Sequence, residues 1–389
     1  MKQPSIVAPG GSYHKAIIAL DYGADAVYVG SQHFSLRKSA DNLSMRALTH
    51  LCQYAQSLSK KVYLAINIFP HESDISGLIK LFESIKTIPL SALIISDLGV
   101  CQLARDYTDI PIHASTQASI TNIESASLWK SMGAKRIVLA REATLKETQR
   151  IKNALNIETE VFIHGAMCSS FSGKCTISNV TSGRDSNRGG CVQSCRHQYQ
   201  LSNGDSLTVM NSKDLQGLAC IPDYFNANVD ALKIEGRMKS ALYVANTVQQ
   251  YRLAIDSYAK NPALFNQQLP LYESALNRVS NRGFTSANLI NKAGKDSISY
   301  QWNGYHRSIE IVGIVKSHTE NTSLIEVKNP IYSGQSYRVL SPMQSEHAPT
   351  TVHCLTVSGT PISHLTPNEC GFISQKFSPN SIIVQDIHD

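Results

Sequence analysis

The residues best suited to chemistry are four cysteines in one stretch of the chain: Cys168, Cys175, Cys191 and Cys195. Their spacing is C-x6-C-x15-C-x3-C, and the residues between them are rich in glycine, serine and positively charged side chains. A polar, Gly-rich stretch cannot build its own apolar core, and long irregular excursions from a compact domain are usually functional. Four thiols in such a stretch predict a segment organised around a bound metal.

The spacing also bears on which metal is bound. Structural zinc sites usually carry C-x2-C pairs, and this segment has none. A loose spacing suits an iron–sulfur cluster held by four thiolates, because the segment can wrap around an object larger than one ion. The pattern therefore favours an iron–sulfur cluster and leaves zinc as the alternative. The remaining cysteines lie in apolar or strand-like contexts and are interpreted as core or incidental thiols.

Composition limits the class of protein. The chain has 389 residues and a formal net charge of +6, which allows a polyanionic partner without demonstrating one. The first residues lack the apolar run of a signal peptide, and no apolar stretch approaches the length of a membrane span. We therefore expect a cytoplasmic protein with no membrane partner, in which thiols stay reduced and bind metal rather than form disulfides.

Short apolar runs alternate with amphipathic stretches over the first two-thirds of the chain. This alternation predicts a parallel sheet covered by helices. The number of runs fits a (β/α)8 TIM-like barrel, with a doubly wound open sheet as the alternative. The predicted strands are Ser5–Ala8, Ala26–Gly30, Val62–Asn67, Ala92–Ser96, Pro111–Ala114, Arg136–Ala140, Glu160–His164 and Asp230–Glu235.

The rest of the chain is divided by changes in pattern. We predict a barrel domain over residues 1–258 that includes a cysteine-rich metal loop at 165–200. A polar connector at 259–307 follows, with one helical pattern near Leu271–Val279. Short alternating runs split by turns over 308–389 predict a small antiparallel β-barrel.

Several predicted strands end in polar residues, and the carboxyl ends of barrel strands form the active site in this type of fold. His113, His164, Glu235 and Arg237 are therefore candidate catalytic residues in a substrate pocket. The alternative is that such residues cap the following helix. Capping is the preferred interpretation for Asp97 and Ser115.

Several long motifs together resemble the collagenase-like peptidase family of unknown catalytic type. The central motifs are VFIHGAMCSSFSGKCTISN, NRGGCVQSCR, NSKDL at 211–215 and LKIEGRMKSALYVANTVQQYR at 232–252. Shorter matches extend the resemblance over essentially the whole chain: APGG at 8–11, ADAVYVG at 24–30, SLR at 35–37, VYLAIN at 62–67 and NRGFTSAN at 281–288. The chain has no His-Glu-x-x-His and no Gly-x-Ser-x-Gly motif, so the peptidase activity in the family name is the weaker expectation.

The resemblance implies a 4Fe–4S cluster bound by the four cysteines named above. It also implies oxygen-independent hydroxylation, and the branch with this length and layout is implied to make 5-hydroxyuridine at the wobble position of tRNA. Prephenate is implied as a required small metabolite and possible co-substrate. Alternatives within the family are hydroxylation of another RNA or of a ubiquinone precursor, and a further alternative is a non-catalytic RNA-binding protein.

An RNA substrate fits the residues as well as the resemblance. A wobble base in the tRNA anticodon loop is unpaired or cheaply splayed out, so an enzyme can reach its ring. The cations proposed to hold RNA phosphates are Arg184, Arg188, Arg196 and Lys239. The alternative for these side chains is ordinary solvated charge, or compensation of the negative charge of a cluster. A homo-oligomer is compatible with the sequence.

Overall fold

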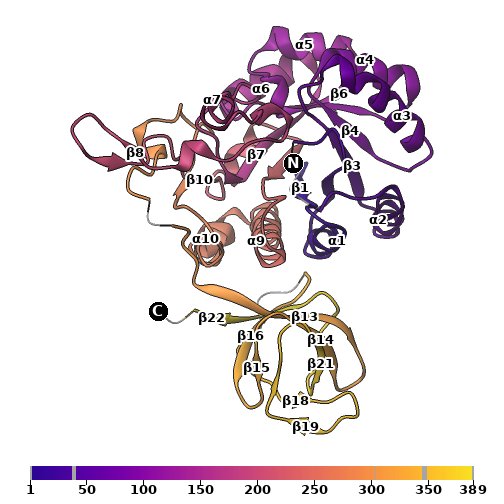
Figure 1. Cartoon of the computed structure of the whole chain (residues 1–389), viewed down its shortest axis with the longest axis vertical. Helices are drawn as coiled ribbons and strands as arrows, with labels where there is room; N and C mark the ends of the chain where they lie inside the picture. Colours follow the sequence, from indigo (N-terminus) through magenta and orange to yellow (C-terminus); the bar gives the residue numbers. More distant parts are fainter. Residues whose placement is uncertain (1, 37–40, 303, 344–347, 388–389) are drawn as a thin grey trace.

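The computed structural model describes residues 2–36, 41–302, 304–343 and 348–387. It consists of a large α/β barrel and a smaller β lobe at the opposite end of the molecule (Figure 1). The barrel strands are β1 (Ser5–Pro9), β2 (Ala26–Gly30), β3 (Lys61–Ile66), β4 (Ala92–Ile95), β5 (Ile112–Ala114), β6 (Ala134–Val138), β7 (Glu158–Ala166) and β11 (Ala231–Ile234).

The eight strands close into a parallel barrel. Each strand pairs with the next along the chain, and β11 pairs with β1 on one side and with β7 on the other. The predicted barrel is therefore confirmed, and the alternative of an open sheet is wrong. Each of the predicted strands overlaps one observed strand, because strands buried on both faces appear as short apolar runs.

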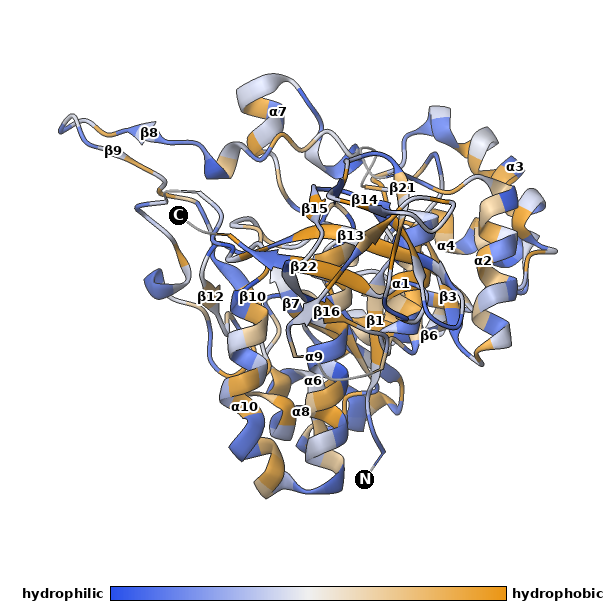
Figure 2. Cartoon of the chain, turned by 90° about the horizontal axis from the view of Figure 1, so that it is seen from below, coloured by the Kyte–Doolittle hydropathy of each residue, from blue (hydrophilic) through white to orange (hydrophobic). Residues whose placement is uncertain are grey.

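Helices cover the outside of the barrel, with their apolar faces toward the strands (Figure 2). They are α1 (Tyr13–Asp21), α2 (Met45–Ser57), α3 (Ile75–Ile85), α4 (Leu98–Tyr107), α5 (Ile123–Ser131), α6 (Leu145–Leu155), α8 (Ile221–Asn226) and α9 (Ala241–Lys260). The Asp97 side chain accepts a hydrogen bond from the Val100 amide at the start of α4. The Ser115 hydroxyl accepts one from the Gln117 amide at the start of the 3-10 turn Thr116–Ala118. Both residues act as caps, as predicted.

The barrel interior combines alanine, valine, isoleucine and tyrosine side chains with a buried ion network. Glu160 is fully buried, and its carboxylate lies 2.9 Å from Arg136 and 2.7 Å from Lys233. Burial opposes ionisation of Glu160, but the two cations outweigh it and lower the pKa of this carboxyl to about 2. Arg136 also binds Glu158, whose side chain is 47% exposed.

Between β7 and α8 the chain leaves the barrel and returns. This stretch contains α7 (Ile177–Ser182), the 3-10 turns η3 (Ser186–Arg188) and η4 (Ser194–Arg196), and a hairpin of β8 (Tyr199–Gln200) and β9 (Ser206–Leu207). Strand β10 (Asp214–Gln216) then pairs antiparallel with the end of β7. The hairpin projects from the side of the barrel (Figures 1 and 2).

The connector carries a longer helix than the pattern predicts. Helix α10 (Pro262–Asn277) starts at Pro262 rather than near Leu271, because Asn261 caps it and proline fits the first helical position. It packs against α9. Strand β12 (Phe284–Thr285) follows and pairs with β10. The other short helices are the 3-10 turns η1 (Glu72–Asp74), η2 (Thr116–Ala118) and η5 (Lys295–Ser297).

Within the described residues, the smaller lobe consists of a curled eight-stranded antiparallel sheet and a separate two-stranded antiparallel sheet, and it has its own apolar core. Its strands are β13 (Ile309–His318), β14 (Ser323–Val327), β15 (Ile331–Tyr332), β16 (Ser336–Leu340), β17 (Thr350–Thr351), β18 (Cys354–Leu355), β19 (Pro361–Ile362), β20 (His364–Leu365), β21 (Cys370–Ile373) and β22 (Ile382–Asp386). The hydroxyl of Tyr22, the residue that follows α1, donates to the Leu340 carbonyl at 2.7 Å, which ties the lobe to the barrel. Among the described residues, no helix is long and apolar enough to cross a membrane.

Candidate functional site

The cysteine-rich segment lies over the carboxyl ends of the barrel strands. It is held there by contacts with several barrel loops: Arg188 forms an ion pair with Asp74 at 2.5 Å, and the Phe69 amide donates to the Asn187 carbonyl at 2.9 Å. Gly173 has φ +76°, and a Cβ there would lie 2.1 Å from the Gln117 carbonyl oxygen. Only glycine allows the segment to approach the barrel so closely.

The segment brings the four cysteines into one region. Cys168 and Cys191 are exposed, and Cys175 and Cys195 are half-buried. Burial raises the pKa of the Cys195 thiol, the charges of the other three thiols raise it further, and Arg196 lowers it. Within the described part of the chain, no group of three or more His, Cys, Asp or Glu side chains is arranged to hold a single metal ion.

Cys175 is surrounded by hydrogen-bond donors. Burial opposes ionisation of this thiol, but hydrogen bonds from the Ser170 hydroxyl and the Ile177 backbone amide outweigh it and lower its pKa. Donors directed at a thiolate stabilise its negative charge and tune a metal or cluster bound to it. The Cys175 carbonyl also accepts a hydrogen bond from the Asn187 side chain at 2.9 Å, which holds the segment in place.

Beneath the segment, a small charged pocket of about 50 Å³ occupies the mouth of the barrel. Glu235 and Arg237 line it, together with Lys233 and Arg141. Arg141 lies 3.8 Å from the Glu235 carboxylate, and Arg237 donates to the Ser35 hydroxyl at 2.6 Å. The structure thus brings together two of the four predicted catalytic residues, Glu235 and Arg237.

The two predicted histidines lie outside this pocket. His113 is 5% exposed, deeper in the barrel, with its ring centroid 4.8 Å from that of Tyr63. Burial, followed by the nearby Arg136, lowers the pKa of His113 to about 3. Its imidazole is therefore neutral near pH 7.

His164 points away from the barrel interior. The register between β7 and β11 shifts after Phe162, so that β7 has one extra residue, Ile163, and the next side chain is redirected. Burial lowers the pKa of His164 to about 3. Three aromatic rings surround it at centroid distances of 5.4 to 5.8 Å: Tyr243, Tyr251 and Phe284. A catalytic role for either histidine stays a prediction.

These two pKa values predict acid sensitivity. The unfolded chain, in which histidine has a pKa near 6.5, binds more protons than the folded chain between pH 6.5 and 3. The stability contributed by the neutral imidazoles is fully present above this window and is lost as the pH falls through it. The free energy of unfolding, measured with urea, should be lower at about pH 5.5 than at about pH 7.5 by about 1.4 kcal/mol per histidine. The His164→Gln variant should show about half of the pH-dependent loss of stability that the two histidines cause together. A variant with the same pH dependence as the wild type would contradict the low pKa of His164.

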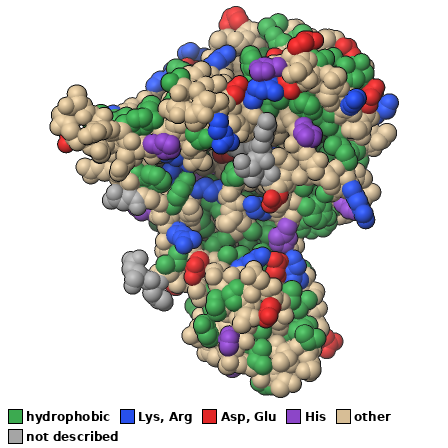
Figure 3. Space-filling view, viewed as in Figure 1, with side chains coloured by type: hydrophobic (Ala, Val, Ile, Leu, Met, Phe, Trp, Pro, Cys, Tyr) green, Lys and Arg blue, Asp and Glu red, His purple; other side chains and the backbone are tan. Residues whose placement is uncertain are grey.

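Three of the four proposed RNA-binding cations already contact other residues of the chain. Arg188 binds Asp74, and Arg196 donates to the Tyr305 hydroxyl at 2.9 Å. Lys239 donates to the Ser280 carbonyl at 3.0 Å. Arg184 is exposed. On the face shown in Figure 3, cationic side chains are scattered rather than gathered into one patch, so RNA binding by these residues stays a prediction.

Two features of the site escaped the sequence analysis. The first is Lys233, which lines the pocket and carries its amine 4.4 Å above the Tyr28 ring. Alternation along a strand places residues 233 and 235 on one face, and this signal could have identified Lys233. The second is the pair of Arg282 and Asp214, both almost fully buried and 2.6 Å apart, which join the connector to β10.

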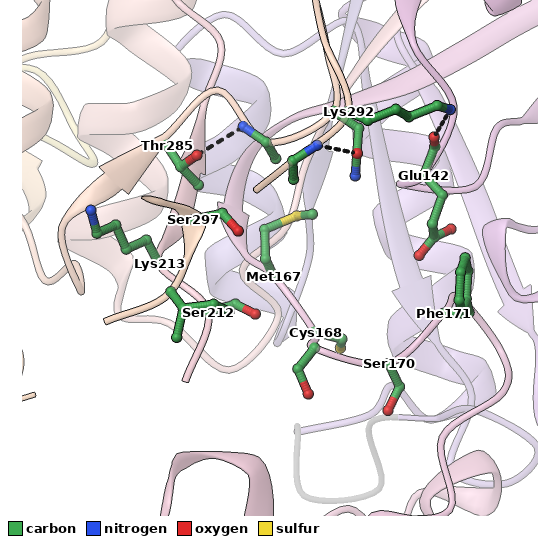
Figure 4. Close-up of a pocket in the computed structure, with 15 residues that line it drawn as sticks. Glu142, Met167, Cys168, Ser170, Phe171, Ser212, Lys213, Thr285, Lys292 and Ser297 are labelled. Atoms are coloured by element: carbon green, nitrogen blue, oxygen red, sulfur yellow. Dashed lines mark hydrogen bonds between the residues drawn. The ribbon is translucent and has the colours of Figure 1, made fainter. Parts of the chain in front are cut away.

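A larger cavity of about 470 Å³ lies beside Cys168 (Figure 4). Met167 and Cys168 lie in its middle, Phe171 on one side, and Ser212 and Lys213 on the other. The Phe171 ring is 70% exposed. The cavity therefore places an open aromatic face and a cation on either side of one of the four clustered cysteines.

Comparisons with known proteins agree with this architecture. The pattern of peptidase family U32 matches residues 11–299. The chain is 35% identical to "tRNA hydroxylation protein P1" of Bacillus subtilis, covering 84% of this chain and 80% of that protein. It is 36% identical to "tRNA hydroxylation protein P" of Helicobacter pylori strain 26695, covering 90% of this chain and 86% of that protein. It is 31% identical to the "23S rRNA 5-hydroxycytidine C2501 synthase" of Escherichia coli, covering 83% of this chain and 50% of that protein. The chain belongs to peptidase family U32, the collagenase-like peptidases.

Proposed function

We propose that this chain is an RNA-modifying enzyme that hydroxylates uridine at C5, at the wobble position of tRNA. Three named relatives support RNA hydroxylation, and two of the three names specify tRNA. The observation that carries the proposal is the position of a segment with four cysteines, held by barrel loops over a charged pocket at the end of the barrel where active sites form. We further propose that the reaction is independent of molecular oxygen.

A 4Fe–4S cluster bound by Cys168, Cys175, Cys191 and Cys195 is part of the proposal. The donor set fits in its chemistry, because four thiolates are the usual ligands of such a cluster, and the segment that carries all four is fixed to the barrel loops through Arg188 and Asn187. The donors around Cys175 would stabilise its thiolate form. When bound, the cluster would supply electron-transfer chemistry at the barrel mouth. Zinc in the same place is the second candidate, and analysis of iron and labile sulfide decides between them.

The pocket at the barrel mouth is the proposed site for an anionic metabolite, prephenate by the family resemblance. Lys233, Arg237 and Arg141 offer cationic side chains around the volume of about 50 Å³. That space exceeds the roughly 30 Å³ occupied by one water molecule, so it suits a carboxylate group rather than a whole ring. Among the described residues, the buried Thr116 hydroxyl and the Arg141 Nε have no hydrogen-bond partner, and a bound carboxylate would supply one.

The experiment that tests the proposal is mass spectrometry of the modified nucleosides of tRNA. The gene is deleted in the source organism, then restored as wild type or as Cys191→Ala. We expect 5-hydroxyuridine and its derivatives to disappear on deletion and to return with the wild type alone. Unchanged tRNA in the deletion strain would contradict the proposed substrate.

The same strains test the remaining alternatives. Loss of hydroxycytidine from ribosomal RNA, with tRNA unchanged, would favour the activity named for the Escherichia coli relative. Degradation of gelatin by the wild-type protein, but not by Cys191→Ala, would favour the peptidase activity in the family name.

A further inference from the structure

The cavity beside Cys168 differs from the charged barrel pocket in size and in lining. Its volume of about 470 Å³ falls in the range of roughly 300 to 1,000 Å³ typical of small-molecule sites. The barrel pocket, at about 50 Å³, is too small for a nucleotide. A substrate that reacts near the cysteines needs a cavity that touches one of them, and Cys168 forms part of this wall.

Phe171 is an exposed aromatic ring on a rigid turn. The Phe171 carbonyl accepts a hydrogen bond from the Lys174 amide at 3.0 Å. The neighbouring Ser172 is buried, and its amide donates to the Glu142 carboxylate at 3.0 Å. The backbone that follows Phe171 is thus held in place while the Phe171 side chain is 70% exposed. An aromatic face presented in this way can stack on a nucleobase at little cost in conformational entropy.

The opposite wall of the cavity offers polar groups that are free for a ligand. Lys213 is half-buried, and within the described ranges its amine makes no hydrogen bond or ion pair. The Ser212 hydroxyl beside it likewise has no partner among those residues. Lys292 and Asn288, by contrast, are occupied by contacts within the chain. Lys213 and Phe171 lie on opposite sides of the cavity, with Met167 and Cys168 between them (Figure 4).

We propose that this cavity receives the extruded uridine nucleotide of a single-stranded RNA loop, with the base stacked on Phe171 and a backbone phosphate at Lys213. The inference rests on the proposed RNA hydroxylase function and deepens it, because it assigns the substrate base to one cavity. Enzymes that modify a base take it out of its stack into a pocket, which fits a lining of one aromatic ring and several hydroxyl groups.

A second groove supplies a matched control. It lies on the other side of the cysteine segment, has a volume of about 610 Å³ and is lined by Phe69 and His71. Phe69 is 60% exposed, close to the 70% of Phe171. Phe171→Ala and Phe69→Ala therefore remove the same side chain, at similar exposure, from two different cavities. Neither change removes a buried contact, and Phe171→Trp keeps an aromatic face.

The test uses the anaerobically purified full chain and an anticodon stem–loop RNA with 5-iodouridine at the wobble position. We expect photocrosslinking to the peptide that contains Met167 to Phe171. Phe171→Ala should weaken RNA binding by about 5- to 150-fold, the usual range for loss of one stacked base. Phe171→Trp should restore binding, and Phe69→Ala should leave it unchanged. Lys213→Gln should weaken binding and make it less dependent on salt.

The outcomes separate the two proposals. A crosslink to the groove of Phe69, or loss of binding in Phe69→Ala but not in Phe171→Ala, overturns the assignment of the cavity even if tRNA is hydroxylated. A wild-type chain that neither binds nor crosslinks the RNA also overturns it. Crosslinking in the cavity, without any 5-hydroxyuridine that depends on the gene, instead overturns the proposed reaction and leaves the binding site in place.

Discussion

Replacing Cys195 by alanine should abolish both cluster binding and hydroxylation. Cys195 lies in the 3-10 turn η4, in the same segment as Cys168, Cys175 and Cys191, and these four are the proposed ligands. A cluster held by four thiolates loses a ligand in the variant and gains an exposed iron. Anaerobically purified wild type should contain about four iron atoms per chain with matching labile sulfide. The variant should contain almost none, and its 5-hydroxyuridine product should fall below detection.

Cys370→Ala is the matched control for this experiment. Cys370 is likewise an unpaired cysteine, but it lies on β21 in the smaller lobe. Its replacement should leave iron, sulfide and hydroxylation at the wild-type level. A colourless wild-type protein that contains zinc would exclude the cluster. Full iron content in Cys195→Ala would show that this residue is not a ligand and would leave the other three cysteines to be tested.

The sequence predicted the scaffold well because its signals are local. Buried parallel strands appear as short apolar runs, and helix starts such as those capped by Asp97 and Ser240 carry recognisable capping residues. The extra residue in β7 has no such signal. It turns His164 out of the barrel, so that alternation counted from the start of the strand places this side chain on the wrong face.

The candidate site was predicted less completely because its contacts join distant parts of the chain. Arg188 and Arg196 appear in the sequence as free cations in a polar segment. Their partners, Asp74 and Tyr305, lie more than 100 positions away along the chain. Lys233 was overlooked because a lysine within an apolar strand suggests an edge, whereas here a buried carboxylate supports it. Such pairings form only when the barrel closes and the connector packs against it.

The ion network inside the barrel predicts the largest effect on stability. Glu160→Gln keeps the shape of the side chain and removes its charge. Arg136 and Lys233, which are both buried, then lose their shared carboxylate. Breaking a buried ion pair by removing one partner typically costs about 3–5 kcal/mol, because a charge is left uncompensated in a medium of low polarity. We expect a decrease of this size in the free energy of unfolding, measured by urea denaturation near pH 7.

Glu158→Gln provides the comparison, because both glutamates bind the same arginine. Arg136 lies 2.8 Å from Glu158 and 2.9 Å from Glu160, yet the Glu158 side chain is 47% exposed and that of Glu160 is fully buried. Solvent screens the exposed pair, so Glu158→Gln should cost no more than about 1 kcal/mol. Equal losses in the two variants would contradict the argument from burial. A small loss in both would mean that water reaches the interior of the barrel and replaces the missing carboxylate.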